Sequence, residues 1–508
     1  MKHLVYAVQP WPLFLTTITF MFTLLLFFFK LSKKKDTSNL PPSPPKLPVI
    51  GNLHQLGSLA HRSLQALSEK YGPIMLLQLG SVPTVVVSSA EMACKIMKTH
   101  DLIFASRPPL SMTKRLLYDS DVAFTPYGEY WRQVRRVCVV HLLSLKRVQS
   151  FRLVREEEVS LLVEKIRESC NGVVNLSEML LNLTNNVICR VALRRKYFGE
   201  EGEGYNFSEM LKEFICLLGS FPVGDFIPWL GWIDLLSGLD ARVTKNFREL
   251  DGFLERVLDD HLHDKGTSSN DEEDRSFVEV LLSLDEKDDM AGISLSRDNL
   301  KAIILDMFSA GTDTTYTVIE WAMAELIKNP KAMKRVQEEV RGVTGGKRKI
   351  TEENIDRMKY LKAVIKETLR MHPPIPLLIP RESMEDVELQ GYHIPAGTRV
   401  IMNGWAIGRD PKSWDKPREF YPERFGSYDV DFKGQDFRLI PFGAGRRGCP
   451  GIGFGMATIE LTLAHLLNHF DWGFSDGMKE EVLDMRESPG FVAHKASSLV
   501  LIAKPRFA

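Results

Sequence analysis

Apolar residues recur at helical spacing through most of the chain. Between positions 90 and 283 they return every three or four residues, which is the period of an amphipathic helix packed on a core. The longest such pattern covers Arg297–Lys328 and predicts one long helix. Pro330 suits the first position of the next helix, with Asn329 as its cap. A further helix is predicted over Met358–Met371, just before two prolines.

Strand-forming runs are few and scattered. The run from Tyr71 to Ser89 is rich in β-branched residues and is broken by Gly80 and Pro83, which predicts a hairpin. Gly391–Asn403 mixes strand-forming and turn residues. Helices and strands do not alternate regularly, which argues against a parallel βαβ sheet. The pattern therefore predicts a mainly α protein with small β-sheets, in the α+β class.

The N-terminus carries a separate signal. Trp11–Phe29 is nearly all apolar and uncharged, and about 20 such residues span a bilayer as a helix. A cleaved signal peptide is the alternative, but it would carry its positive charge before the apolar run and small residues after it. Lysines instead follow the run and predict that this flank is cytosolic; they are Lys30, Lys33, Lys34 and Lys35.

Prolines dominate the next segment, PPSPPKLPVIG, from Pro41 to Gly51. Proline fixes φ and removes backbone donors, so the segment is predicted to be extended and semi-rigid. A disordered linker is the alternative, but its apolar Leu47, Val49 and Ile50 favour docking onto the body. The expected parts are a membrane anchor at 1–35, a proline-rich hinge at 36–51 and a folded body at 52–508.

Composition excludes several classes of function. The 508 residues are 44% hydrophobic and 26% charged, as in ordinary globular proteins. Lys+Arg and Asp+Glu number 65 each, so no net basic field favours nucleic acid as a partner. The cysteines lack the spacing of a structural zinc site or a disulfide framework, which fits a reducing compartment; they are Cys94, Cys138, Cys170, Cys189, Cys216 and Cys449.

The stretch PFGAGRRGCPG, Pro441–Gly451, admits more than one chemical interpretation. Its glycines fit the G-x-G-x-x-G pattern that binds a dinucleotide pyrophosphate, but Pro441 interrupts the required strand and Asp471 lies at the wrong end of the next one. Cys449 is alternatively a metal-binding thiolate, because Pro450 suits the first position of a helix whose N-terminus favours the anion. A buried, inert cysteine remains the third alternative.

Further motifs decide between these alternatives. Phe442, Gly445, Arg447, Cys449 and Gly451 match F-x-x-G-x-R-x-C-x-G. Four more motifs lie in the order of the same family: W-x-x-x-R at Trp131–Arg135, A-G-T-D-T-T at Ala310–Thr315, E-x-x-R at Glu367–Arg370 and P-E-R-F at Pro422–Phe425. The chain thus resembles the cytochrome P450 family over essentially its whole length, and most closely the membrane-anchored plant A-type enzymes of the seventy-one clan. The resemblance implies the cytochrome P450 fold with an N-terminal transmembrane helix.

The resemblance implies haem b (iron protoporphyrin IX) as cofactor, with Cys449 as the axial ligand of the haem iron and 52–508 as the haem-thiolate catalytic domain. A single soft thiolate suits haem iron. Phe442, Gly443 and Gly451 are expected around the cofactor, since glycines let the backbone approach and hydrogen-bond the sulfur.

Three residues are expected at the haem propionates by the same resemblance. They are Trp131, Arg135 and Arg447, and arginine suits bidentate contacts with carboxylates. A basic surface face that also carries Arg132 and Arg136 is the alternative for Arg135.

Asp313 and Thr314 stand in the middle of the long predicted helix, although both compete there for backbone hydrogen bonds. The resemblance implies that they deliver protons during oxygen activation, which favours a monooxygenase over an isomerase or dehydratase. Glu367 and Arg370 share one helical face, and the resemblance adds Arg424 to a buried, structural charge network.

Substrate contacts follow from family analogy alone. The candidate residues are Ala310, Gly311, Ile375, Leu377 and Phe491, and the candidate stretches include Ser111–Phe124 and Phe214–Trp232. These stretches are mostly apolar, so a hydrophobic substrate is expected. A terpenoid or alkaloid fits, with a coumarin, phenolic or oxime substrate as the alternative.

The chain shows no convincing flavin or nicotinamide site. The resemblance therefore implies electrons from NADPH–cytochrome P450 reductase, with cytochrome b5 as a further donor and O2 as co-substrate. It implies a single-pass protein of the endoplasmic reticulum membrane, in contact with lipid, whose catalytic domain is cytosolic. A haem-thiolate isomerase or dehydratase, or a non-enzymatic haem-binding protein, is the alternative of another class.

Overall fold

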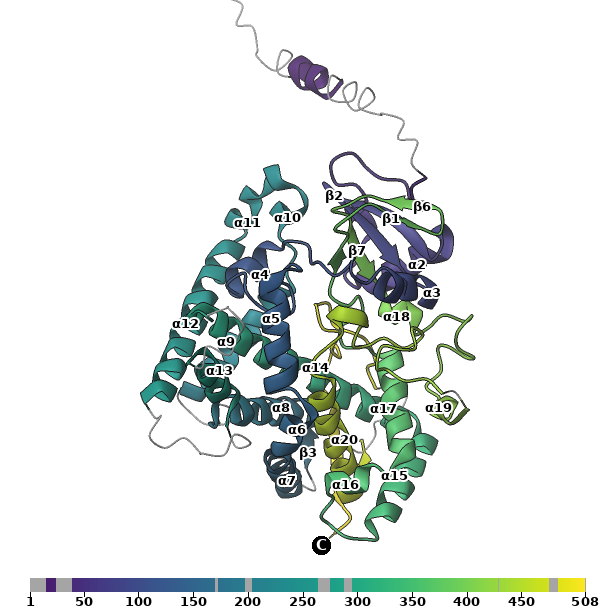
Figure 1. The fold of residues 1–508 in the computed structure, drawn as a ribbon. Coiled ribbons are helices and arrows are strands. Elements are labelled where there is room, and N and C mark those ends of the chain that lie inside the picture. Colours follow the sequence, from purple (N-terminus) through teal and green to yellow (C-terminus); the bar gives the residue numbers. More distant parts are fainter. Residues whose placement is uncertain are drawn as a thin grey trace, which may run out of the picture.

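The computed structural model describes residues 15–23, 39–169, 172–196, 203–263, 275–286, 295–427, 429–474 and 483–507. Within these residues the body is mainly helical and holds a four-stranded, a three-stranded and a two-stranded sheet (Figure 1). The predicted mainly α fold with small sheets is confirmed.

Helices build most of the body. Those of the first half are α2 (Ala60–Tyr71), α3 (Ala90–Cys94), α4 (Ser111–Leu116), α5 (Glu129–Val137), α6 (Leu145–Ser150), α7 (Arg152–Glu168), α8 (Leu176–Leu193), α9 (Glu203–Leu218), α10 (Val223–Phe226), α11 (Trp232–Leu236) and α12 (Leu239–His263). Those of the second half are α13 (Phe277–Glu286), α14 (Arg297–Lys328), α15 (Pro330–Thr344), α16 (Glu352–Ile355), α17 (Lys359–Met371), α18 (Gly404–Ile407), α19 (Arg424–Ser427) and α20 (Ile452–His469).

Helix α14 crosses the centre of the body and packs against α8, α17 and α20 (Figure 1). It has the predicted bounds. Ser296 and Asn299 cap its start reciprocally, each side chain accepting a hydrogen bond from the other residue's N–H. Phe308 and Trp321 are fully buried, as expected for a helix that is covered on nearly all sides.

The four-stranded sheet has the order β1-β2-β7-β4. Its β1 (Ile74–Leu79) and β2 (Val82–Val87) form the predicted antiparallel hairpin, turned at Gly80 with φ +59°. Strand β7 (Arg399–Met402) then pairs in parallel with β2, and β4 (Arg381–Glu382) pairs antiparallel with β7. The other strands are β3 (Val173–Asn175), β5 (Val387–Leu389), β6 (Tyr392–Ile394), β8 (Phe470–Gly473) and β9 (Val500–Pro505).

One predicted cap has the expected position but not the expected hydrogen bond. Helix α15 begins at Pro330 as expected, but Asn329 makes no side-chain capping bond to it. Its amide instead donates to the main-chain oxygen and the carboxylate of Glu325, at 2.8 and 3.2 Å. The side chain therefore closes the end of α14, where carbonyl groups lack partners.

The described part of the proline-rich segment docks on the sheets. The Asn39 carbonyl accepts from the His393 N–H at 2.8 Å, and the Pro42 carbonyl accepts from the Leu76 N–H at 2.9 Å. The buried Asn52 amide holds the Pro45 carbonyl at 3.2 Å. These contacts fix the segment to the body.

Only residues 15–23 of the predicted anchor are described, and they are helical. The remainder of that prediction lies outside the described residues. Across the described ranges, no single helix is long and apolar enough to cross a bilayer. The segments Glu209–Phe226 and Pro228–Leu236 have the required length and apolar character only when taken together, and a bend of 111° separates them.

Candidate functional site

The loop at residues 441–451 is folded back on itself ahead of α20. The Cys449 N–H donates to the Phe442 carbonyl at 2.9 Å. Gly443 and Gly445 have φ near +67° and +68°, and a Cβ at Gly445 would lie 2.4 Å from the Asp101 carboxylate. Only glycine fits there. Helix α20 begins at Ile452, so the prediction of Pro450 at its first position is wrong, because the hydrogen bond to Phe442 keeps the preceding residues in the loop.

Cys449 has accessible surface although many protein atoms surround its side chain. The residue has exposed surface although burial by the protein around it raises the pKa of its thiol. The Gly451 N–H and the charge of Arg135 act in the opposite direction. The thiol therefore faces an interior space instead of the outer surface.

One stretch of α14 borders the same region. A Cβ at Gly455, on the second turn of α20, would lie 3.7 Å from the Thr315 hydroxyl, so the two helices touch close to the cysteine loop. Ala310 is exposed in a helix that is otherwise largely buried. Thr314, one turn later on the same face, donates to the Ala310 carbonyl at 2.6 Å. Helix α14 is thus in contact with α20, the helix that follows the cysteine loop, through a buried residue next to Thr314.

Asp313 points elsewhere. Its carboxylate is buried and lies 3.1 Å from Nε2 of His494. The structure therefore brings Thr314 to the accessible face of α14 and holds the Asp313 carboxylate against a residue of the C-terminal loop.

Arginines gather beside the cysteine loop. Arg447 donates to the carbonyls of Ala105 and Thr125 at 2.6 and 2.8 Å, and its guanidinium lies 3.8 Å from the Trp131 ring centroid. Its Nη1 is buried and makes no hydrogen bond. Burial and the nearby charges of Arg381 and Arg135 lower the pKa of Arg447 to about 9.

Arg107 and Arg381 complete this arginine cluster. Burial and the charge of Arg447 hold the pKa of Arg107 well below its usual value. Arg381 donates to the Ala444 carbonyl at 2.7 Å, and Arg135 donates to the Gly448 carbonyl at 2.5 Å. The cluster is strongly positive and touches the loop from two sides, which favours a ligand that carries carboxylates.

Trp131 contributes mainly through its ring. Its Nε1–H donates to the Val122 carbonyl at 3.0 Å, and its ring face supports the Arg447 guanidinium. Of the neighbouring basic residues, Arg132 and Arg136 are exposed, and Arg132 pairs with Glu129.

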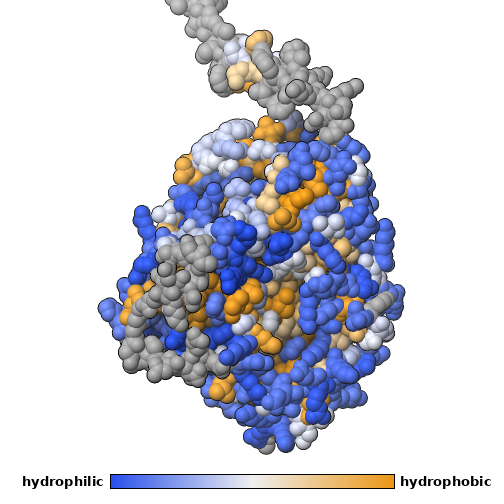
Figure 2. Space-filling view, in the orientation of Figure 1, coloured by the Kyte–Doolittle hydropathy of each residue, from blue (hydrophilic) through white to orange (hydrophobic). Residues whose placement is uncertain are grey.

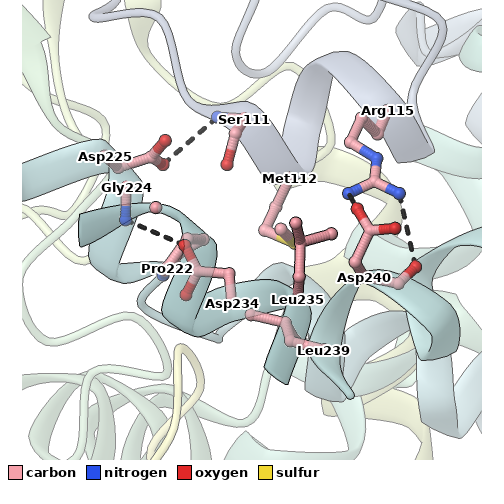
Figure 3. Close-up of a pocket in the computed structure, with 11 residues that line it drawn as sticks. Ser111, Met112, Arg115, Pro222, Gly224, Asp225, Asp234, Leu235, Leu239 and Asp240 are labelled. Atoms are coloured by element: carbon pink, nitrogen blue, oxygen red, sulfur yellow. Dashed lines mark hydrogen bonds and ion pairs between the residues drawn. The ribbon is translucent and has the colours of Figure 1, made fainter. Parts of the chain in front are cut away.

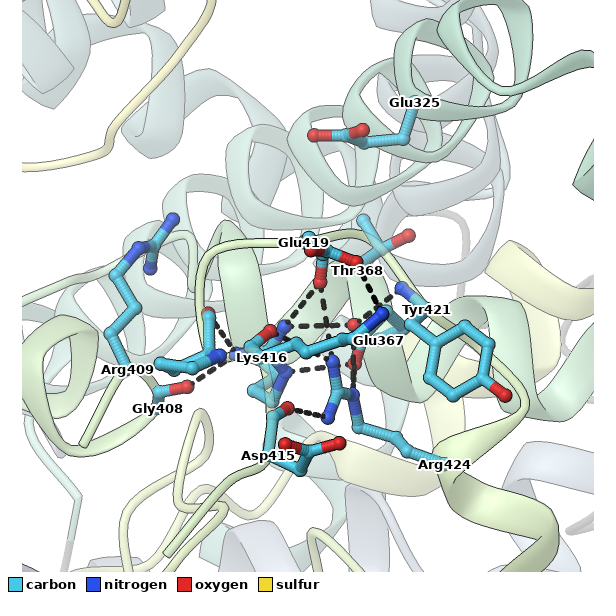
Figure 4. A network of polar contacts seen from close by, with 12 residues as sticks. Glu325, Glu367, Thr368, Gly408, Arg409, Asp415, Lys416, Glu419, Tyr421 and Arg424 are labelled. Atoms are coloured by element: carbon cyan, nitrogen blue, oxygen red, sulfur yellow. Dashed lines mark hydrogen bonds and ion pairs between the residues drawn. The ribbon is translucent and has the colours of Figure 1, made fainter. Parts of the chain in front are cut away.

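Glu367, Arg370 and Arg424 form one buried network (Figure 4). Arg370 donates to both Glu367 oxygens at 2.8 Å, and Arg424 Nε lies 3.0 and 3.1 Å from the same two atoms. The Tyr421 N–H adds a further bond at 2.8 Å. The remaining guanidinium protons reach main-chain carbonyls, including that of Gly408. The network ties α17 to the segment ahead of the cysteine loop.

The predicted substrate residues lie in different surroundings. The Phe491 ring is 5.9 Å from that of Phe124, and its backbone packs against Gly219 at the end of α9. Gly311 leaves space that Ile188 borders, because a Cβ there would lie 3.1 Å from its Cδ1. Leu377 packs against the apolar core beside the four-stranded sheet. Ile375 is half-buried.

A separate pocket of about 270 Å³ lies between α4 and the α10–α12 segment (Figure 3). Asp225 accepts from the Ser111 N–H at 3.2 Å, and Arg115 pairs with Asp240 at 2.5 Å. No lining residue comes from α14 or from the cysteine loop. The pocket borders the two predicted substrate stretches Ser111–Phe124 and Phe214–Trp232 but does not reach the residues of the cysteine loop.

A family model described as Cytochrome P450 matches residues 41–502. The chain belongs to the cytochrome P450 family. It is 55% identical over 496 residues to Cytochrome P450 71A1 of Persea americana, covering 96% of this chain and 99% of the relative. It is 51% identical over 493 residues to norfluorocurarine oxidase of Strychnos sp, covering 94% and 96%. A zebra fish cytochrome P450 solved with abiraterone has 26% identity and a TM-score of 0.75, covering 89% of this chain and 100% of that one.

This P450 is therefore a monooxygenase whose cofactor is haem b. The observed residues fit that group. Haem carries two propionate carboxylates, and the arginine cluster offers buried positive charge with an unpartnered donor, Nη1 of Arg447. Cys449 offers a single soft thiol beside it.

Three residues of this P450 escaped the sequence interpretation. Arg107 stands just before two prolines, and Arg381 begins a two-residue strand. His494 follows the predicted Phe491 contact by three positions. Each of these residues acts through partners that are far away in the sequence, so the local pattern does not reveal its role. The only local signal is the proline next to Arg107 and next to Arg381.

Proposed function

We propose that this monooxygenase holds haem b through Cys449 and oxidises a hydrophobic plant specialised metabolite, either a terpenoid or an alkaloid. The observation that carries the proposal is an accessible thiol in a glycine loop that leads into α20, the helix packed against α14, which carries the accessible Ala310 and Thr314. Haem, when bound, supplies the redox-active iron with which the family activates O2.

The loop residues orient the sulfur. The hydrogen bond from the Cys449 N–H to Phe442 fixes the backbone. Burial raises the pKa of the thiol, and the Gly451 N–H offsets part of that rise by stabilising the anion. Arg447, with Arg107 and Arg381, would bind the propionates, because guanidinium groups match carboxylates in geometry and charge.

Proton handling falls to α14. Thr314 Oγ1 now donates to the Ala310 carbonyl and is accessible, so rotation about χ1 can present its proton to the reacting side. Asp313 Oδ2 holds the next proton position, away from bulk water. An accessible hydroxyl that is next in sequence to a buried carboxylate is suited to proton transfer, with the carboxylate held by His494.

An apolar substrate agrees with the side chains above this face. Phe124 and Phe491 form an aromatic pair, and Ala310 adds a small apolar surface. The 51% identity to a norfluorocurarine oxidase favours an alkaloid within this class. Coumarins, phenolics and oximes are the competing substrates.

We also propose membrane attachment at one end of the body, in the endoplasmic reticulum. Large apolar residues are exposed around α10 and α11: Phe221, Trp229, Trp232, Leu235 and Leu236. This segment touches the β1–β2 turn, where Ser81 N–H donates to the Phe226 carbonyl at 2.7 Å. Figure 2 shows further hydrophobic residues at the end of the body that faces helix 15–23. Such a patch, next to a predicted anchor, suits immersion in lipid.

Electrons come from a redox partner in this family, and we assign that role to NADPH–cytochrome P450 reductase, with cytochrome b5 as a second donor. Arg132, Arg136 and Arg446 are exposed near the cysteine loop and suit an acidic docking face. Arg446 also approaches Asp101 at 3.6 Å, which leaves Arg136 as the most available cation of the three.

The test uses microsomes that contain the full chain and the reductase, supplied with NADPH and O2. A panel of terpenoids, alkaloids, phenolics and oximes is incubated and analysed for products that carry added oxygen. We expect a product from a terpenoid or alkaloid that requires NADPH. Products from phenolics or oximes alone would overturn the substrate class, and conversion without NADPH would overturn the oxidative role.

A further inference from the structure

His494 lies directly against the proton-handling turn of α14. Its Nε2 is 3.1 Å from Asp313 Oδ2, and its Nδ1 is 2.8 Å from the Thr317 hydroxyl. Its ring stacks on Tyr316, with centroids 5.4 Å apart and planes inclined by 23°. Both ring nitrogens are therefore engaged by residues one turn apart on α14.

The partners define the protonation state of the ring. The Thr317 hydroxyl donates to the Asp313 main-chain oxygen at 2.7 Å, so its oxygen accepts from Nδ1–H. Nε2 faces a carboxylate, which also accepts. The bond of Thr317 to the Asp313 carbonyl and the 3.1 Å approach of Nε2 to the carboxylate together favour the imidazolium, in which both nitrogens carry a proton. Burial lowers the pKa of His494, but the hydrogen bond and charge of Asp313, together with the charge of Glu320, outweigh it and raise the pKa overall.

Charged groups surround the pair on each packed element. Glu320 lies further along α14, and burial raises its pKa although the Ser177 hydroxyl of α8 hydrogen-bonds it. Lys495, next in the chain, has its pKa lowered by burial and donates to the Asp484 carbonyl. His494 is 24% exposed and Asp313 is 9% exposed, so the imidazole is the more accessible member of the pair.

We propose that His494 is the positioning and proton-supplying partner of Asp313. Its Nε2–H bond breaks as an O–H bond forms at Asp313 Oδ2, which leaves a neutral imidazole with its proton on Nδ1. Water then returns a proton to Nε2. The inference rests on the proposed monooxygenase function and adds to it the route by which protons reach Asp313 from outside.

The variants are His494→Gln, which can hydrogen-bond Asp313 but carries no charge, and His494→Lys, which keeps a cation. His393→Gln is the matched control, because His393 also faces a carboxylate, Asp386, at 3.8 Å but lies on β6. The reduced, carbon-monoxide-bound spectrum of each variant establishes that the haem protein has folded. His494→Lys remains measurable if His494→Gln does not fold.

Stability is measured first, as Tm from pH 6 to 9. A raised histidine pKa adds stability that is fully present below the unfolded pKa of about 6.5 and is lost as pH rises through the folded value. The Tm gap between wild type and His494→Gln should thus be largest at pH 6 and shrink toward pH 9. His494→Lys should recover part of the gap. A gap that is constant with pH, or as small as that of His393→Gln, overturns the ion pair and with it the proposal.

Turnover is measured second. Loss of a general acid that acts directly on the reacting group lowers the rate about a hundredfold or more. Loss of His494, which only passes protons to Asp313, should lower the product formed per NADPH by roughly tenfold. The fall of the wild-type rate at alkaline pH should be absent in His494→Gln. If His494→Gln has the rate and the product per NADPH of the wild type, proton transfer from His494 to Asp313 is refuted. A wild type without NADPH-dependent product refutes the monooxygenase proposal instead, and the Tm gap then decides the ion pair alone.

Discussion

The buried network around Glu367 offers a quantitative test of how the fold supports the cysteine loop. Glu367→Gln keeps the shape of the side chain and removes its charge. The side chains of Glu367, Arg370 and Arg424 are 0%, 0% and 2% exposed, so no solvent screens the two cations that remain. Breaking such a buried ion pair costs about 3–5 kcal/mol.

The structure places the cost at the lower end of that range. Arg370 keeps carbonyl acceptors at Gly408, Pro417 and Glu419, and Arg424 keeps those of Asp415, Lys416 and Glu419. We therefore expect about 3 kcal/mol. For a body of about 450 residues, roughly 1 kcal/mol corresponds to 1 °C, so Tm should fall by about 3 °C.

The assay is calorimetry of the haem-loaded proteins at one scan rate, because proteins of this size often unfold irreversibly. Glu353→Gln is the matched control: its side chain is 81% exposed and pairs with Arg152 at 3.3 Å. That change should cost less than about 0.5 kcal/mol. If the two variants melt at the same temperature, the reasoning about the buried network is refuted.

Three further predictions concern separate residues. Thr314→Ala should lower the product formed per NADPH, because an accessible hydroxyl on α14 is lost, and unchanged coupling in a turnover assay would count against that role. Arg447→Gln should lower the haem retained after gel filtration by weakening the positive cluster; equal haem content would contradict the propionate assignment. Burial, helped by the charge of His469, lowers the pKa of His465 to about 4 from 6.5, so stability present above pH 6.5 is lost as pH falls toward 4. His465→Gln should therefore lose less Tm over that window than wild type, and parallel losses would disprove the cause.

Local chemistry predicted the elements well. The hairpin of β1 and β2 follows from β-branched runs around Gly80, and the bounds of α14 follow from its apolar span between Ser296 and Asn329. Pairing between distant elements does not follow from such patterns. The parallel contact of β2 with β7 joins Thr84 to Arg399, and nothing near either residue specifies the other.

The same limit applies to the site. The glycine loop alone left three alternatives open for Cys449, and the family motifs elsewhere in the chain decided between them; the positive φ of Gly443 and Gly445 is seen only in the fold. Asn329 occupies the N-cap position of α15 but bonds the end of α14 with its side chain, and Pro450 stays in the loop, two positions before the first residue of α20. His494 was missed because its meaning comes from Asp313, far away in the sequence and in contact only after folding.

The central claim is that the Cys449 sulfur is the axial ligand of haem iron. The reduced, carbon-monoxide-bound difference spectrum of Cys449→Ser tests it most directly, with Cys216→Ser, an exposed cysteine on α9, as control. We expect wild type and Cys216→Ser to show the Soret band of a thiolate-ligated haem and Cys449→Ser to lose it. Retention of that band in Cys449→Ser would show that another group ligates the iron.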